Sequence, residues 1–183
     1  MPFSLLAVVS KAIFDSRLPA INRAIEQFAV SGFRAEMVHR NLDWMQALNI
    51  EYDASCFDVD PFQAMPGGVG GIWPFGVGKF VELPYTLPQD HTRFVSLGET
   101  TTRIWEARLA FVRKHHGMAL MLMHPDYLCP QNGLKLYVAF LSEVLESATL
   151  GTFCRVRWRA GTWASIGKEI GRTVRSAVLH SVV

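Results

Sequence analysis

The sequence lacks most of the features that mark well-known functional classes. Its three cysteines, Cys56, Cys129 and Cys154, lie far apart, so they form neither a CxxC metal pair nor a disulfide framework. No apolar run approaches the roughly 20 residues of a membrane span, and no basic residue precedes the short apolar start as in a signal peptide. GxSxG, Walker, HExxH and dinucleotide motifs are also absent. We therefore expect a cytoplasmic chain without a membrane partner.

Charge is nearly balanced overall but unevenly distributed. The net charge is +2, yet residues 151–183 hold six basic side chains and one acidic side chain. Trp158 and Trp163 lie among these basic residues, a pattern that could contact nucleic acid or a membrane surface. We nevertheless expect no nucleic-acid partner, because a change of reading frame, described below, would produce such a tail without selection.

Hydrophobic periodicity predicts an α/β fold with a mainly parallel sheet, in one domain. Helices are expected over residues 17–32, 39–49, 101–117 and 132–147, and a buried strand over 117–123. Short strands are expected at 50–55, from residue 80, and just before Arg34. In the first helix, Pro19 suits the first turn and Phe28 the inner face. Residues 58–78 are rich in Pro and Gly and predict a long loop.

Polar side chains follow two of the predicted strands, where ligands bind in parallel sheets. His124 follows the buried strand and is either a general acid or base or a hydrogen-bonding strand cap. Arg34 could clamp a carboxylate or form a surface ion pair. Asp58 and Asp60 could act with Arg34, bind a metal, or only form a turn.

Two further pairs have a structural and a functional interpretation. His115 and His116 end a predicted helix, where a positive charge suits the helix dipole. Trp73 and Phe75 could stack on a sugar ring or hold the long loop in place.

Three segments carry a resemblance to a known family. They are GFRAEMVHRNLDWMQALNIEYDASCFDVDPFQ (32–63), VELPYTLPQD (81–90) and GMALMLMHPDY (117–127). Together they resemble the polysaccharide deacetylases, or NodB-homology domains, from about residue 12 to about residue 147. The resemblance implies a distorted (β/α) barrel, similar to a TIM barrel, that hydrolyses N-acyl groups of carbohydrates or related amides with zinc or another divalent metal.

The resemblance also implies roles for individual residues. Arg34 matches the motif arginine that orients the catalytic base, although the proline usual shortly after it is absent. Asp58 or Asp60 falls where an aspartate supports that arginine. His124 matches the general acid that protonates the leaving amine. Leu122 falls where an apolar side chain lines the acetyl pocket.

The family motifs that supply the base and the metal ligands would lie before Ala12. The eleven residues there contain no His, Asp or Glu. We therefore expect no metal cofactor in this chain and no activity as given. The sheet should also lack its first strands and self-associate through an open edge. The alternative is a non-catalytic remnant that binds a carbohydrate or a protein partner.

The chain divides into an atypical segment (1–11), a partial deacetylase-like domain (12–150) and a basic tail (151–183). Read one frame over, the codons from Gly151 permit HILPREVARWY, similar to the end of related domains, and FSLLAVVS permits LFAGSRK. This predicts a gene truncated by a frameshift, with the missing motifs encoded upstream in the shifted frame. Resequencing the locus would test it, and upstream DNA without such motifs in any frame would contradict it.

Overall fold

The computed structural model describes residues 10–35, 40–60, 68–128, 132–147 and 178–182. The helices are α1 (Lys11–Gln27), the 3-10 helix η2 (Trp44–Ala47), the π-helix η3 (His91–Ser96), α2 (Arg103–Lys114), α3 (Pro125–Leu128) and α4 (Gly133–Ser147). The strands are β1 (Gly32–Phe33), β2 (Tyr52–Asp53), β3 (Phe75–Val77), β4 (Phe80–Glu82), β5 (Ala119–Met123) and β6 (Val178–Val182). The fold is thus α/β, as the periodicity predicts.

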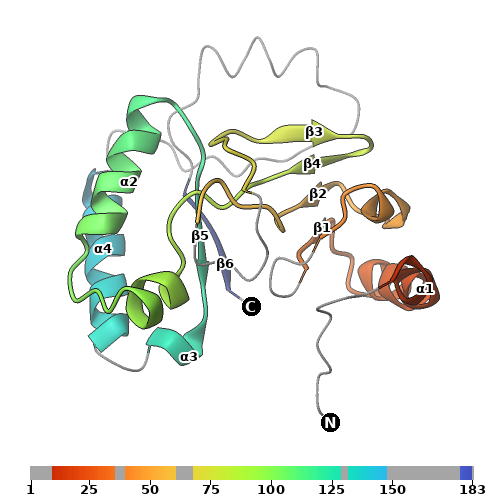
Figure 1. The fold of residues 1–183 in the computed structure, drawn as a ribbon, viewed down its shortest axis with the longest axis horizontal. Helices are drawn as coiled ribbons and strands as arrows, with labels where there is room; N and C mark the ends of the chain where they lie inside the picture. Colours follow the sequence, from red (N-terminus) through yellow and green to blue (C-terminus); the bar gives the residue numbers. More distant parts are fainter. Residues whose placement is uncertain (1–9, 36–39, 61–67, 129–131, 148–177, 183) are drawn as a thin grey trace.

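The strands form a small, partly open sheet (Figure 1). In the order β1-β2-β4-β3, the first three strands are parallel and β3 is antiparallel to β4. Single parallel bridges continue the pairing beyond the strands, from Phe57 to Tyr85 and from Leu87 to Met121 in β5, and β5 is parallel to β6. Because these strands share one direction, their carboxyl ends lie at the same side of the sheet.

Strand β5 lies between two apolar cores. Ala119, Met121 and Met123 pack with buried side chains of α2 and α4, whereas Leu120 and Leu122 pack with side chains around β4. Alternation along a strand sends successive side chains to opposite faces, so an unbroken apolar run is needed when both faces are covered. Figure 1 shows α2 and α4 beside β5. The predicted buried strand over 117–123 is confirmed.

Helices α2 and α4 are also confirmed within a few residues of their predicted ends. Leu109 and Val112 of α2 are buried, and the largest side chain in this core is Trp105. The Trp105 ring contacts Phe140 of α4 at 5.3 Å between centroids, and its Nε1–H donates to the Pro88 carbonyl at 2.7 Å. These contacts hold the two helices on β5.

Helix α1 differs from its prediction at both ends. It begins at Lys11 after the N-cap Ser10, whose side chain accepts from the Ile13 N–H, so Pro19 lies inside the helix and not in its first turn. It ends at Gln27, and Phe28, predicted on the inner face, is the C-cap residue and 70% exposed. Ala29 follows with a positive φ of 50°, which turns the chain out of the helix before Gly32.

The helix predicted over 39–49 is reduced to the single turn of η2. The Asn41 side chain accepts the Trp44 N–H at 3.1 Å, and the turn begins at Trp44, well after the predicted start of the helix. Met45 and Leu48 are nevertheless buried, in a core shared with α1 and Phe80.

The long loop predicted over 58–78 contains strand β3 at its end. Residues 1–9 and 148–177 lie outside the described residues, as do Trp158, Trp163, Cys129 and Cys154. In the parts of the chain that the structure describes, no helix is both long and apolar enough to cross a bilayer.

Candidate functional site

The side chain of His124 is held by a buried carboxylate at the carboxyl end of β5. Its Nδ1 lies 2.8 Å from Oδ1 of Asp90, which is fully buried, whereas His124 is 37% exposed. Asp90 also accepts the backbone N–H of His91, at 2.9 Å, and that of His124. An imidazole with its proton on Nδ1 donates to Asp90 Oδ1 and leaves Nε2 as the ring nitrogen for other partners.

Aromatic packing fixes the same imidazole from another side. Tyr127 of α3 meets the His124 ring edge-on at 5.4 Å between centroids and the His91 ring at 5.1 Å. Since Asp90 is the N-cap of η3 and Tyr127 lies in α3, two short helices position one histidine. The sequence interpretation did not select Asp90, although it follows an extended segment just as His124 does.

Arg34 lies directly after β1 and is partly buried. Burial lowers the pKa of its guanidinium, and the negative charges of Asp53 and Asp90 act in the opposite direction. Arg34 therefore lies within electrostatic range of the carboxylate that holds His124. The structure thus brings the two predicted residues to the same side of the sheet.

Asp60 belongs to the same neighbourhood. Its Oδ2 accepts the hydroxyl of Thr92 in η3 at 2.8 Å. Burial raises the pKa of Tyr85, Asp60 adds to this effect, and Arg34 opposes it. The Tyr85 hydroxyl is buried and has no hydrogen-bond partner within the described part of the chain. Asp60, Tyr85 and Arg34 therefore influence one another electrostatically.

Asp58 has a charged partner in helix α2. The resemblance offered either Asp58 or Asp60 as the partner of Arg34, and the Asp58 carboxylate forms an ion pair with Arg108 of α2. Arg108 also donates to the Thr86 carbonyl at 3.0 Å, and the Asp58 N–H donates to the Tyr85 carbonyl at 3.0 Å. Asp58 thus ties the chain after β2 to α2.

The predicted substrate-binding residues do not gather in one place. Leu122 is buried two residues before His124, on the inner face of β5. Trp73 is 50% exposed, but its neighbour Ile72 accepts the Met118 N–H at the amino end of β5. Trp73 therefore lies at the opposite end of this strand from His124. Phe75 lies in β3 opposite Glu82.

A pair of buried carboxyl groups, Asp53 and Glu82, was missed by the sequence interpretation. They are register partners at the ends of β2 and β4, and neither is exposed. Burial raises the pKa of Glu82 to about 8, and the hydrogen bond and charge of Asp53 add to this effect. The signal in the sequence was an acidic residue at the end of each of two short strands.

The described residues do not form the metal site that the family resemblance implies for intact relatives. No group of three or more His, Cys, Asp or Glu side chains converges among them. A catalytic zinc needs about three protein ligands. These residues therefore do not supply the ligand set of a catalytic zinc. His115 and His116 are exposed at the end of α2, with backbone N–H groups donating to helix carbonyls.

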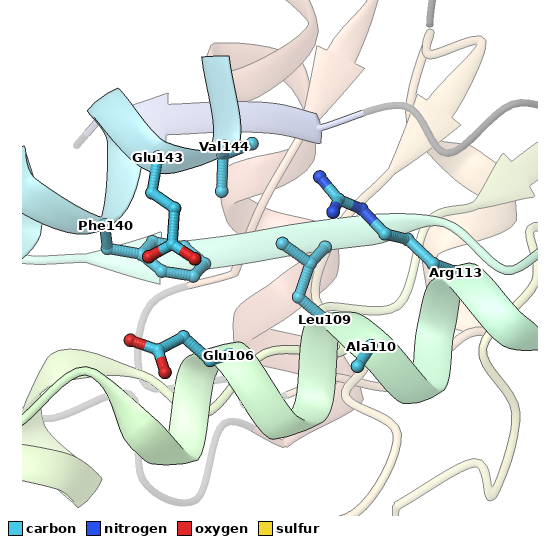
Figure 2. A pocket seen from close by; sticks show the side chains of 7 residues that line it. All are labelled: Glu106, Leu109, Ala110, Arg113, Phe140, Glu143 and Val144. Carbon is cyan, nitrogen blue, oxygen red and sulfur yellow. The ribbon is translucent and has the colours of Figure 1, made fainter. Parts of the chain in front are cut away.

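A pocket of about 400 Å³ opens between α2 and α4. Figure 2 shows the carboxylates of Glu106 and Glu143 at one end and Arg113 toward the other, over an apolar floor that includes Leu109 and Phe140. None of the candidate site residues lines it. The pocket is thus a feature of the helix layer and separate from the strand-end site.

No family model, curated protein or solved structure matches this chain.

Proposed function

We propose that this chain is a domain of the polysaccharide deacetylase type, directed at the N-acyl group of an amino sugar, with His124 as its general acid. One observation carries the proposal: a buried carboxylate, Asp90, holds an accessible imidazole at the carboxyl end of a buried parallel strand. The parallel direction of β1, β2, β4 and β5 supports the distorted (β/α) barrel as the wider fold.

The arrangement suits protonation of a leaving amine. In hydrolysis of an N-acyl group, water adds to the acyl carbon, the C–N bond breaks, and the nitrogen leaves with a proton. In this proposal His124 Nε2 donates that proton, while the hydrogen bond between Nδ1 and Asp90 holds the imidazole in its orientation. Arg34 adds positive charge near the same strand ends, and Leu122 offers apolar surface beneath the acyl group.

This set of residues forms one half of a hydrolytic site. In this proposal His124 supplies the acid and Arg34 the positive charge, and no group of three or more metal ligands converges among the described residues to activate water. We therefore infer that the chain recognises N-acetylated sugars without completing their hydrolysis.

The test combines ligand binding with product analysis. Chitotriose should shift the NMR signals of His124, Tyr127 and Leu122, and no acetate should appear above the blank. His115→Ala, an exposed histidine at the end of α2, is the matched control for His124→Ala. Acetate release that disappears in His124→Ala but not in His115→Ala would support His124 as the general acid. It would contradict the inference that the chain does not complete hydrolysis. Absence of both binding and release would refute the proposal.

A second candidate is carbohydrate binding through Trp73. The observation that favours it is the 50% exposure of this indole at the amino end of β5. Aromatic faces pack well against sugar rings, and this position is remote from His124. Loss of chitotriose binding in Trp73→Ala, but not in the exposed control Phe111→Ala, would favour this candidate over the strand-end site.

A further inference from the structure

Asp53 and Glu82 are neighbours in an unusual setting for two acids. They are register partners on adjacent parallel strands, β2 and β4, and both side chains are fully buried. Two ionised carboxylates in contact away from water repel each other and lose hydration, so one of them normally keeps its proton.

The hydrogen bonds identify which oxygen has room for that proton. Asp53 accepts the Ser55 hydroxyl at Oδ1 and the Ser55 N–H at Oδ2, both at 2.9 Å. Glu82 accepts the Cys56 N–H at Oε1, at 2.7 Å. Its other oxygen, Oε2, is buried and receives no N–H or O–H donor from the residues that the structure describes. The two carboxyl groups influence each other's pKa through a mutual hydrogen bond, and such a bond between two carboxyls requires a proton on one of them.

We propose that Asp53 and Glu82 share a single proton, carried on Glu82 Oε2, and that the pair positions Arg34 at the strand-end site. Glu82 then donates to Asp53, and the pair has one negative charge instead of two. That remaining charge acts on the Arg34 guanidinium, because Asp53 raises the Arg34 pKa against the effect of burial. The direction of the pKa shifts agrees with this arrangement, since burial raises the pKa of both acids.

A chain of hydrogen bonds connects the pair to Arg34. The Ser55 hydroxyl donates to Asp53 and accepts the N–H of Ala35, the residue after Arg34, at 2.7 Å. Asp53 and Glu82 therefore act as positioning residues, through Ser55, on the backbone that carries Arg34. This positional role rests on the proposed function, whereas the shared proton does not.

The shared proton makes stability depend on pH in a defined direction. Glu82 binds its proton up to about pH 8 in the fold, against an ordinary pKa of 4.5. The contribution of protonated Glu82 to the free energy of unfolding is therefore complete below pH 4.5 and is lost as pH rises toward 8. Among the described residues, Arg34 and Cys56 are the other titratable or charged groups facing the pair. Arg34 interacts with Asp53, and Cys56 interacts with Glu82 and with Arg40.

The test uses the full chain and follows protonation directly. Carbon-13 NMR of the side-chain carboxyls should show Glu82 protonated at about pH 6, where ordinary glutamates are ionised. Glu82→Gln retains a donor for Asp53 and an acceptor for Cys56, so it should fold and lose the decline of melting temperature between pH 4.5 and about 8. Glu51→Gln, an exposed acid beside β2, should retain that decline.

Amide exchange reports the positional role. Asp53→Ala should accelerate hydrogen exchange at the Ala35 N–H, and Glu82→Gln should leave it slow below pH 8. An ionised Glu82 at about pH 6, or an unchanged melting profile in Glu82→Gln, would overturn the shared proton. If Glu82→Gln does not fold, the wild-type titration still decides. Slow Ala35 exchange in Asp53→Ala would overturn the positional role. None of these measurements depends on deacetylation, so a failure of the shared proton can be distinguished from a failure of the proposed function.

Discussion

At the scale of single residues, Asp90 determines the geometry of His124. Its fully buried carboxylate accepts two backbone N–H groups and the imidazole. Asp90→Ala should leave these donors without an acceptor, at about 1–3 kcal/mol for each buried group. Urea unfolding should therefore show a loss of several kcal/mol, whereas Asp126→Ala, exposed in α3, should change stability by no more than about 0.5 kcal/mol. Equal effects would contradict the buried role of Asp90.

Cys56 gives a second residue-scale prediction. Burial, followed by the charge of Glu82, raises the pKa of its thiol to about 12. Since the thiolate is the reactive form, iodoacetamide at pH 8 should leave Cys56 unmodified in the folded chain and modify it in urea. Peptide mass spectrometry can locate the label. Rapid labelling of Cys56 without denaturant would show that this part of the core opens easily.

At the scale of elements, the Asp58–Arg108 ion pair joins the chain after β2 to α2. It is largely buried, whereas the Lys11–Asp15 pair on α1 is exposed. Removing one partner of a buried pair costs about 3–5 kcal/mol, and an exposed helical pair contributes about 0.3–0.5 kcal/mol. Asp58→Ala should therefore destabilise the fold far more than Asp15→Ala.

A double-mutant cycle separates the pair from other effects of these substitutions. Asp58→Ala and Arg108→Ala should show a large coupling energy in the cycle, and Asp58→Ala with Arg34→Ala a small one. Large coupling to Arg34 would favour Asp58 over Asp60 as the aspartate that supports Arg34 in the family resemblance.

Two aromatic residues of α2 test the packing of this helix on β5. Trp105 is fully buried, and Phe111 is 44% exposed on the same helix. Trp105→Ala should cost about 3–5 kcal/mol in free energy of unfolding, because it removes core contacts and leaves the Pro88 carbonyl without a donor. Phe111→Ala should cost much less. Thermal and urea unfolding of both variants would measure the difference.

At the scale of the whole molecule, zinc tests whether the chain holds a complete metal site. The described residues offer no converging group of three ligands, so zinc should bind no more tightly than to isolated surface histidines. Isothermal calorimetry of the full chain, with His124→Ala and His115→Ala compared, would measure this. Stoichiometric, tight binding would show that residues outside the described parts complete a site.

The local sequence pattern predicted much of the fold but few of the contacts between side chains within the site. The apolar run of β5 and the periodicity of α2 and α4 are local signals, and they located both elements and His124. The partner of His124 lies 34 residues away, and only the register that places Leu87 beside Met121 brings Asp90 next to it. The Asp53–Glu82 pair likewise depends on register between strands. Pro19 misled the prediction because its missing N–H is tolerated on an exposed part of α1.

The position of β5 between two cores has a consequence for how the molecule opens. A strand with only one covered face can loosen together with its own layer, while the other layer persists. Here Met121 belongs to the helix core and Leu120 to the core around β4, so breaking either core exposes part of the same strand. The two layers should therefore unfold as one cooperative unit, with the β5 amides among the last to exchange with solvent. His124, at the end of that strand, is thereby attached to the least labile part of the chain.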